Sequence, residues 1–326
     1  MKKIILLCVL FFTQITSAHA DNELPGVSEF IDEMVTEHQF ERQQLQQLFE
    51  QVEVKDSILK AISRPAEKSK PWYDYRKIFI TDKRINGGVE FWKKHSDTLA
   101  KAEQQYGVPA EIIIAILGVE TRYGGNVGSY RVIDALSTLA FRYPPRSPFF
   151  KSELKHFLIL TREEQKSQLE PVGSYAGAMG LGQFMPSSYR AYSVDFDGDK
   201  HRDIWTNPVD AIGSIANYLN RHGWIAGESI VHPTKLNDAE PTELVEKGYK
   251  PSLNRDELRQ AGVSLTELPH GDDVIALISL TQRYGEEYWL ARQNFYAITR
   301  YNHSRMYAMA VSQLANEIRT QYETKQ

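Results

Sequence analysis

One carboxylate stands at the end of a stretch that is otherwise apolar. Glu120 comes shortly after the run 112–117, Ile-Ile-Ile-Ala-Ile-Leu, and before a glycine pair at 124–125 that is typical of a helix end. The run has no polar face, which predicts a helix that begins at Pro109 and lies inside the domain. Burial disfavours the charged carboxylate and raises its pKa, as a general acid working near neutral pH requires. The alternative is a glutamate that reaches solvent or pairs with Arg122.

A glycine-rich segment, 173–186, is the second candidate. It holds four glycines within ten residues, and glycine lets the backbone approach a ligand closely and adopt positive φ. The spacing is not that of a phosphate loop and no Lys-Ser or Lys-Thr pair follows, so nucleotide binding is unsupported. Ser174 and Gln183 offer neutral hydrogen bonds of the kind that a sugar hydroxyl or amide uses. On its own, such a segment is more often a turn.

Three aspartates at strict alternation, Asp195, Asp197 and Asp199, form the third candidate. Alternating acids converge on one point when the backbone curls, and their hard oxygen atoms suit Ca²⁺. A standard calcium loop has glycine at its sixth position and glutamate at its twelfth, where this chain has Lys200 and Thr206. The pattern therefore predicts a calcium site that matches the standard loop only in its first half. A solvated acidic turn is the alternative.

Aromatic residues are the fourth candidate, with 17 Tyr and 5 Trp in the chain. Tyrosine pairs a flat apolar face with a polar tip, which suits stacking on pyranose rings while bonding their hydroxyls. Most of these tyrosines must be packing residues. The segment 300–303, Arg-Tyr-Asn-His, is the expected exception because it places polar groups in a loop just before the last helix.

Apolar periodicity predicts a mainly helical chain around these candidates. The segment 63–79 differs, because Pro65 and Pro71 each disfavour helix at the preceding residue and so predict an extended strap. From 227 to 270 the periodicity collapses into short runs with Pro, Gly and Asn, which indicates a small β-rich insertion or irregular loops. The expected helices cover 22–62 with a polar break, 86–106, 132–141, 149–160, 207–222, 274–284 and 304–321.

The composition is that of a soluble globular protein. The 326 residues are 42% hydrophobic and 25% charged, with a formal net charge of −4. No basic excess exists that could hold nucleic acid through counterion release, so nucleic acid is not an expected partner.

The first twenty residues have the layout of a secretory signal peptide. Lys2 and Lys3 precede the apolar stretch 4–12, and the small residues at 18–20 supply a cleavage site. The apolar stretch is too short to span a bilayer. The single cysteine, Cys8, lies within it after a bulky leucine, which disfavours a lipid anchor. We therefore expect an exported, soluble, periplasmic protein.

Taken together, four motifs resemble those of the membrane-bound lytic murein transglycosylase B family, whose enzymes cleave peptidoglycan. The motifs, in matching order and spacing, are 118–124, 174–186, 195–201 and 300–302. The resemblance implies a mainly α (α+β) fold, in which a lysozyme-like catalytic core carries an additional helical region and a small irregular or β-rich insertion. It implies the division 1–20 signal peptide, 21–95 N-terminal helical region, 96–226 catalytic core with a calcium-binding loop, 227–270 insertion, and 271–326 C-terminal helices completing the groove.

Matched position by position, the resemblance implies that Glu120 is the sole catalytic acid/base. Ser174 and Gln183 would line the groove near it, and Tyr301 would stand close to it. The other substrate-binding residues that the resemblance implies are Phe184 and Tyr218, which would contact sugar or peptide, Tyr75, Asn302 and Tyr307, and Arg146, which would meet the stem peptide.

The family's metal loop is a longer variant of the EF-hand that a later aspartate closes. The resemblance therefore implies a structural Ca²⁺ held by Asp195, Asp197, Asp199, the backbone of His201, and Asp210. Asp210 is also compatible with a first-turn acid on a helix dipole, and Asp203 is a fallback ligand. No organic cofactor is expected.

The motifs nearest Glu120 contain no second acid, whereas ordinary glycosidases use two carboxylates. The family is held to use a substrate-assisted route that forms 1,6-anhydro ends, and this absence fits that route. The expected partners are peptidoglycan glycan strands and stem peptides, with other cell-wall enzymes as further candidates. Three alternatives stay open: a muramidase that uses water, a non-catalytic peptidoglycan-binding protein, and a calcium-responsive adaptor.

Overall fold

The computed structural model describes residues 24–63, 70–237, 241–269, 271 and 274–324. The expected signal peptide, 1–20, lies outside these residues. Over the described part, the chain is mainly helical and carries one two-stranded and one three-stranded antiparallel sheet. The expected α+β class with a helical majority is confirmed.

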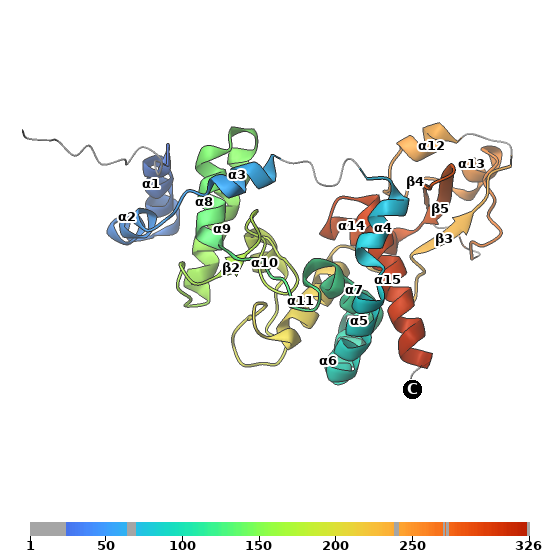
Figure 1. Ribbon diagram of the computed structural model, residues 1–326, viewed down its shortest axis with the longest axis horizontal. Helices are drawn as coiled ribbons and strands as arrows, with labels where there is room; N and C mark the ends of the chain where they lie inside the picture. The colour runs from blue at the N-terminus through green and yellow to red at the C-terminus, as the bar shows by residue number, and fades with distance from the viewer. Residues whose placement is uncertain (1–23, 64–69, 238–240, 270, 272–273, 325–326) are drawn as a thin grey trace, which may run out of the picture.

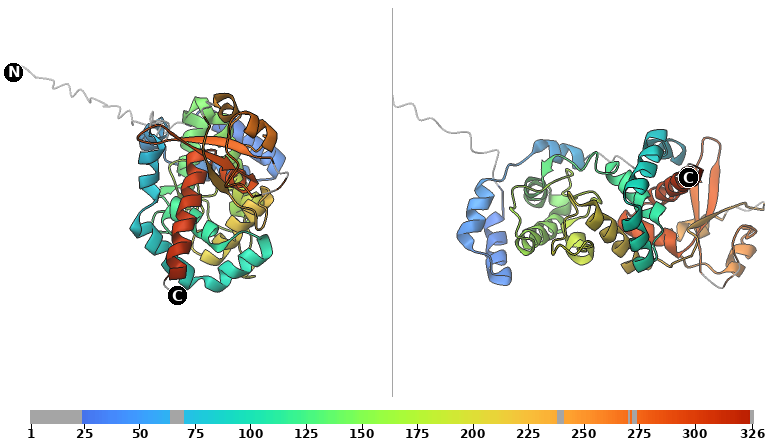
Figure 2. Two further views of the ribbon diagram at one scale, coloured as in Figure 1. Left: turned by 90° about the vertical axis from the view of Figure 1, so that its right-hand side faces the viewer. Right: turned by 90° about the horizontal axis from the view of Figure 1, so that it is seen from below.

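The molecule is elongated (Figure 1). At one end lie α1 (Val27–His38) and α2 (Arg42–Glu50), and at the other lies the three-stranded sheet with α12 (Thr242–Glu246) and α13 (Arg255–Gln260). The right-hand view in Figure 2 shows the same order of parts. The rings of Phe30, Phe49 and Phe141 meet edge to face and join α1 and α2 to α8 (Val132–Arg142).

Helix α7 (Ala110–Thr121) is the centre of the helical body. Its residues from Ile112 to Val119 are buried on every face, as the apolar run predicts. It packs against α15 (Arg305–Thr324), α5 (Asp82–Lys94), α6 (Ser96–Tyr106) and α11 (Pro208–Arg221). Glu120 is therefore carried by a helix that other helices enclose along most of its length.

The prediction of an extended strap over 63–79 is wrong for its second half, because Trp72–Phe79 form helix α4. Pro71 restricts the residue before it and itself takes an extended conformation as the N-cap, so the residues after it are free to form a helix. Trp72 and Tyr75 share the buried face. Helix α4 packs against α15, and α5 packs against both α15 and α7.

The expected helix over 86–106 is two helices, α5 and α6, which meet at His95. The remaining helices of the body are α3 (Asp56–Ile62), α9 (Ser147–Glu163), α10 (Pro186–Tyr192) and the 3₁₀ turn η2 (Pro144–Arg146). The short strands β1 (Tyr130–Arg131) and β2 (Val172–Gly173) pair beside the glycine-rich segment. Asn207 caps α11 through a 3.0 Å hydrogen bond from Val209 N–H, as expected.

The helix expected over 274–284 is also wrong. Residues Ala276–Thr281 form β4, which turns at Gly285 into β5 (Glu286–Ala291). The first five residues of β4 are all buried, and a mostly apolar segment that is buried throughout shows no period that separates a strand from a helix. Strand β3 (Val231–Thr234) pairs with the other edge of β5, giving the order β3-β5-β4. The sheet thus combines β3, from the expected insertion, with β4 and β5, from the region expected to hold only helices. A small separate core is built around Leu258 and Leu290.

Candidate active site

The end of α7 holds Glu120 half-buried at the surface of the body. The expectation that the glycine pair at 124–125 ends the helix is wrong, because α7 ends at Thr121. Its C-cap is Arg122, whose φ of 53° is left-handed, and Tyr123 follows with a φ of 62°. Non-glycine residues in this conformation carry strain on the order of 1–3 kcal/mol each and persist only where the surroundings hold them. The turn after Glu120 is therefore a fixed feature rather than a frayed end.

Buried polar groups hold this turn in place. The Arg84 guanidinium on α5 donates a 2.7 Å hydrogen bond from Nε to the carbonyl of Gly118. Tyr123 donates from its hydroxyl to the Arg84 carbonyl at 2.7 Å. A Cβ at Gly118 would lie 2.5 Å from the Tyr123 hydroxyl, so the close approach requires glycine. The Thr121 hydroxyl, which is also buried, lies 2.9 Å from the Leu181 carbonyl and donates to it, joining α7 to the glycine-rich segment.

A phenol contacts the candidate acid directly. The hydroxyl of Tyr307, on α15, donates a 2.6 Å hydrogen bond to Oε1 of Glu120. Burial raises the pKa of Tyr307 well above its ordinary value, and the charge of Glu120 raises it further. The hydroxyl therefore stays protonated and remains a donor to the carboxylate.

Tyr301 stands close to the acid, as expected, and lies in the last turn of α14 (Gln293–Tyr301) rather than in a loop. Burial first, and then the charge of Glu120, raise the pKa of Tyr301 well above its ordinary value. Its hydroxyl donates a 2.6 Å bond to the carbonyl of Gly182. Its ring packs against those of Tyr218 and Phe184, with centroids 4.8 and 5.7 Å away. Tyr301 thus joins α14 to the glycine-rich segment beside Glu120.

The glycine-rich segment fixes two polar side chains. The Ser174 hydroxyl oxygen accepts hydrogen bonds from the N–H groups of Ala176 and Ala178, at 3.2 and 3.1 Å. The Gln183 amide nitrogen donates to the carbonyls of Val127 and Gly180, at 3.1 and 2.9 Å. Gln183 takes a left-handed φ of 52°, a further strained position near the site.

The structure separates the expected substrate contacts into buried and accessible groups. Tyr75 and Tyr307 are 2% exposed, Phe184 is 3% exposed and Tyr218 is 7% exposed. These rings pack behind the site, and Tyr75 lies near enough to Tyr307 to influence its pKa. Ser174, Gln183, Tyr301 and Asn302 are partly exposed.

Arg146 is exposed and lies over the rings of Phe149 and Phe150, with its guanidinium carbon 4.3 and 5.1 Å from their centroids. Within the described residues it makes no hydrogen bond or ring contact with the cluster around Glu120.

The acidic loop brings three carboxylates together. One oxygen from each of Asp195, Asp197 and Asp210 lies within 4.8 Å of the other two. Asp199 is outside this group, and its Oδ1 accepts the His201 N–H at 2.8 Å. Three converging carboxylate oxygens are a donor set that fits a hard cation such as Ca²⁺.

Asp210 is buried and closes the acidic loop from the start of α11. Its two oxygens accept the N–H groups of Phe196 and Asp203, at 2.7 and 2.8 Å. Burial, followed by the charges of Asp197 and Asp195, raises the pKa of Asp210. Asp203, the fallback ligand, caps the turn at Trp205 instead, with a 2.9 Å bond from that residue's N–H.

Sequence reasoning missed Arg84, Thr121 and Tyr123, which position the end of α7. Arg84 lies far from the motifs, in a segment with no pattern that indicates a site. Thr121 and Tyr123 are inside the motif at 118–124, but their roles depend on partners that only the folded chain brings near.

The fold and this site place the protein in a known class. A family model described as "Transglycosylase SLT domain" matches residues 22–316, and the chain belongs to this family. The resemblance to lytic transglycosylases is thereby confirmed, and the protein is an enzyme of that class with a lysozyme-like fold.

Individual relatives support the same family. The chain is 45% identical over 303 residues to membrane-bound lytic murein transglycosylase B of Escherichia coli K12, and this match covers 90% of this chain and 82% of the relative. The soluble lytic transglycosylase SltB1 of Pseudomonas aeruginosa superposes with a TM-score of 0.87 at 54% identity, over 92% of this chain and all of that one. The Escherichia coli lytic transglycosylase Slt35 in complex with calcium superposes with a TM-score of 0.83 at 43% identity, over 92% and 94%. None of the described helices is both long and apolar enough to cross a membrane.

Proposed function

We propose that this protein cleaves the β-1,4 bond between N-acetylmuramic acid and N-acetylglucosamine in peptidoglycan and leaves 1,6-anhydro-muramic ends. One observation carries the proposal: Glu120 is half-buried at the end of an apolar helix, and a phenol donates to it from 2.6 Å. The lytic transglycosylases among its relatives support the same reaction class.

In the proposed reaction, Glu120 acts first as acid and then as base. It protonates the glycosidic oxygen as the bond from that oxygen to C1 breaks, and the 2-acetamido oxygen stabilises C1 as an oxazolinium-like species. The Glu120 carboxylate then takes the proton from the C6 hydroxyl, whose oxygen bonds to C1. No water is consumed, and the internal nucleophile benefits from proximity. General acid–base transfer of this kind contributes about 10²–10⁴-fold.

Ser174 and Gln183 each keep one hydrogen-bonding atom that has no partner among the described residues. The Ser174 oxygen already accepts two N–H groups, so its hydroxyl hydrogen is free to donate to a substrate oxygen such as that of the acetamido group. Both hydrogens of the Gln183 amide are directed at backbone carbonyls, which leaves Oε1 to accept from a sugar hydroxyl or amide N–H. We assign Ser174 the role of donor and Gln183 the role of acceptor.

Tyr301 and Asn302 complete the proposed contacts at the acid. The nearly buried rings of Tyr75, Phe184, Tyr218 and Tyr307 support these groups from behind, because too little of each ring is exposed to stack on a sugar. Arg146 remains our proposal for a stem-peptide contact, since its exposed guanidinium is suited to a carboxylate.

A structural Ca²⁺ is proposed at the acidic loop. Asp195, Asp197 and Asp210 supply its carboxylate ligands, and the His201 carbonyl is proposed as a fourth. The calcium complex of a 43% identical structure supports this assignment. A bound cation would neutralise three like charges and hold the loop against α11; the reaction at Glu120 does not involve it.

The protein is proposed to act in the periplasm after removal of residues 1–20. This rests on the sequence of the N-terminal segment, which has the charged start, apolar centre and small-residue end of a secretory signal.

The mass of the released muropeptides tests the reaction. A purified sacculus digested with the enzyme should yield anhydro ends, each lighter by one water than the hydrolysed end. Hydrolysed ends would favour a muramidase, which the absence of a second acid in the motifs around Glu120 disfavours.

A further inference from the structure

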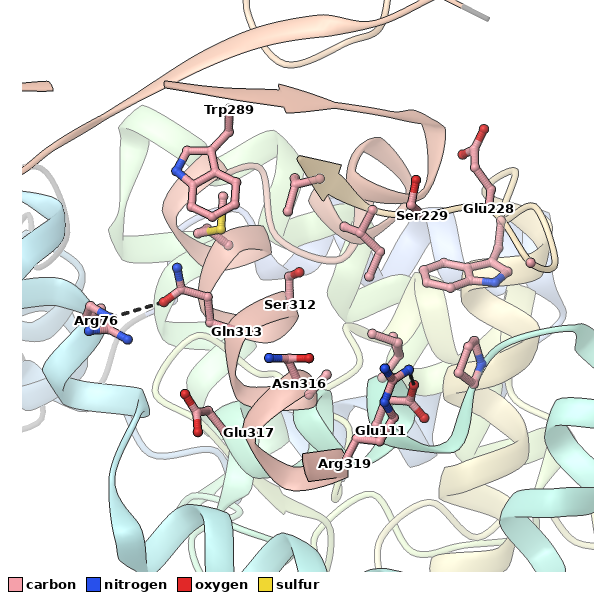
Figure 3. A pocket seen from close by; sticks show the side chains of 18 residues that line it. Arg76, Glu111, Glu228, Ser229, Trp289, Ser312, Gln313, Asn316, Glu317 and Arg319 are labelled. Atoms are coloured by element: carbon pink, nitrogen blue, oxygen red, sulfur yellow. Dashed lines mark hydrogen bonds and ion pairs between the residues drawn. The ribbon is translucent and has the colours of Figure 1, made fainter. Parts of the chain in front are cut away.

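A cavity lies at the opposite end of α7 from Glu120 (Figure 3). Its volume is about 830 Å³, and Glu111 and Ile112, from the first turn of α7, line it. Glu111 and Glu120 are nine residues apart, which is roughly 14 Å along a helix axis. We call this space the far cavity. It is within the size range of small-ligand pockets, about 300–1,000 Å³.

The far cavity lies between the helical body and the three-stranded sheet. One wall is the face of α15 that carries Ser312, Gln313 and Asn316, and Trp289 reaches over it from β5 (Figure 3). Trp224 adds a second indole. Aromatic rings beside short polar side chains suit a ligand that has both an apolar face and hydroxyl or amide groups.

The polar groups on the α15 wall have unused hydrogen-bonding capacity. Gln313 Oε1 accepts from Arg76 Nε at 3.1 Å, and this bond orients the amide and leaves its NH₂ group without a partner among the described residues. Within the same part of the chain, the side chains of Ser312 and Asn316 make no hydrogen bond. Three neutral polar side chains that follow one helix face thus present donors and acceptors to the cavity.

The charges around the far cavity are close to balanced. Glu111 forms a 3.4 Å ion pair with Arg319, and Glu228 forms a 3.3 Å ion pair with Arg292. The other two charged residues of the lining, Arg76 and Glu317, have opposite signs. Such a balance gives no excess positive field for a phosphate and no cluster of free carboxylates for a metal ion. The lining therefore selects a neutral ligand.

We propose that the far cavity binds an N-acetylated pyranose ring of a glycan strand, as a second carbohydrate site separate from the candidate active site at Glu120. Indole faces complement the apolar face of the ring, and the amides of Gln313 and Asn316 complement its acetamido group and hydroxyls. The proposal rests on peptidoglycan being the substrate. Its consequence is that a long strand is held at two places, which lowers KM for intact sacculi and leaves the chemical step unchanged.

Binding can be observed directly at Trp289. In the full-length protein, the Trp289 indole N–H is assigned in a ¹H–¹⁵N spectrum by comparison with Trp289→Phe, and a β-1,4 trimer of N-acetylglucosamine is titrated in. The Trp289 signal should shift and saturate in the wild type and stay unshifted in Ser312→Trp, whose larger side chain obstructs the α15 wall of the cavity. An unshifted wild-type signal, or a shift produced by a free stem peptide and not by the trimer, would overturn the proposal.

Turnover supplies the second readout. Ser312→Trp and the milder Asn316→Ala should raise KM for sacculi, by about tenfold for the first variant, and leave the turnover of soluble disaccharide-repeat fragments unchanged. No change on sacculi in either variant, or an equal loss on both substrates in both variants, would contradict it. The same digests report the mass of the product ends, so failure of the proposed reaction is seen separately from failure of the second site.

Discussion

Tyr307 follows Glu120 by 187 residues, yet its hydroxyl donates a 2.6 Å hydrogen bond to the Glu120 carboxylate. The contact joins the last helix of the chain to the end of the buried helix α7. It fixes the orientation of the side chain on which the proposed reaction depends, and it makes α15 part of the active site.

Replacing Tyr307 with Phe should lower kcat and leave KM for soluble fragments nearly unchanged, because the ring stays in place and only the donor is lost. A hydrogen bond to a charged group contributes about 1.5–3 kcal/mol, which corresponds to roughly 10–100-fold in rate. The matched control is Tyr322→Phe on the same helix, whose ring stacks on Trp92 with a centroid distance of 4.3 Å. A wild-type kcat for Tyr307→Phe would show that the bond does not contribute to catalysis.

Gly182→Ala should destabilise the site, because its Cβ would lie 2.8 Å from the Tyr301 hydroxyl. Overpacking of this kind costs about 1–3 kcal/mol, measurable as a lower midpoint of chemical unfolding. Tyr301→Phe removes the obstructing atom, so the double variant should be more stable than the sum of the single effects predicts. Strict additivity of the two changes would argue against the close approach between these residues.

Calcium should raise the melting temperature of the wild type, and excess chelator should reverse the increase. At a hundred times its Kd, a ligand that binds only the folded state adds about 2.7 kcal/mol to the free energy of unfolding. Asp197→Asn should lose most of the calcium response, because its carboxylate belongs to the converging group, whereas Asp199→Asn should keep most of it. Equal losses in the two variants would place Asp199 among the ligands.

Stability should fall steeply at alkaline pH. Burial and the nearby Glu120 raise the pKa of Tyr301 and Tyr307 well above 10 in the folded protein. Below pH 10 the folded and unfolded states both keep these protons, so the two groups contribute nothing to the pH dependence of the free energy of unfolding. Above pH 10 the unfolded chain releases the protons and the folded chain does not. The unfolded state then binds fewer protons, so the free energy of unfolding decreases with pH, by about 1.4 kcal/mol per unit for each group. Urea unfolding at increasing pH tests this, and Tyr301→Phe should have a shallower slope than the wild type; an unaltered slope would count against it.

The sequence was sufficient for the parts that depend on local pattern. The buried helix with Glu120 near its end followed from an apolar run without a polar face, and the Asn207 cap of α11 from a residue type and its position. The family resemblance added Tyr301, which the structure places beside Glu120.

What the sequence could not predict depends on partners far along the chain. Arg84 holds the Gly118 carbonyl across 34 residues, and no local pattern indicates that role. The left-handed turn at Arg122 is held by tertiary contacts against its own preference, so the glycine pair nearby was the misleading signal. The sequence predicts a helix where β4 lies because every one of its first five residues is buried, which removes the alternation that identifies a strand.

Glu120→Gln tests the central claim most directly. The substitution keeps the size of the side chain and its acceptor for the Tyr307 hydroxyl, and it removes the proton that the glycosidic oxygen must receive. Sacculi incubated with the folded variant should release no muropeptides above background, while the wild type and the control Glu90→Gln, on the neighbouring helix α5, release products with anhydro ends. Product release by Glu120→Gln at a rate comparable to the wild type would contradict the account.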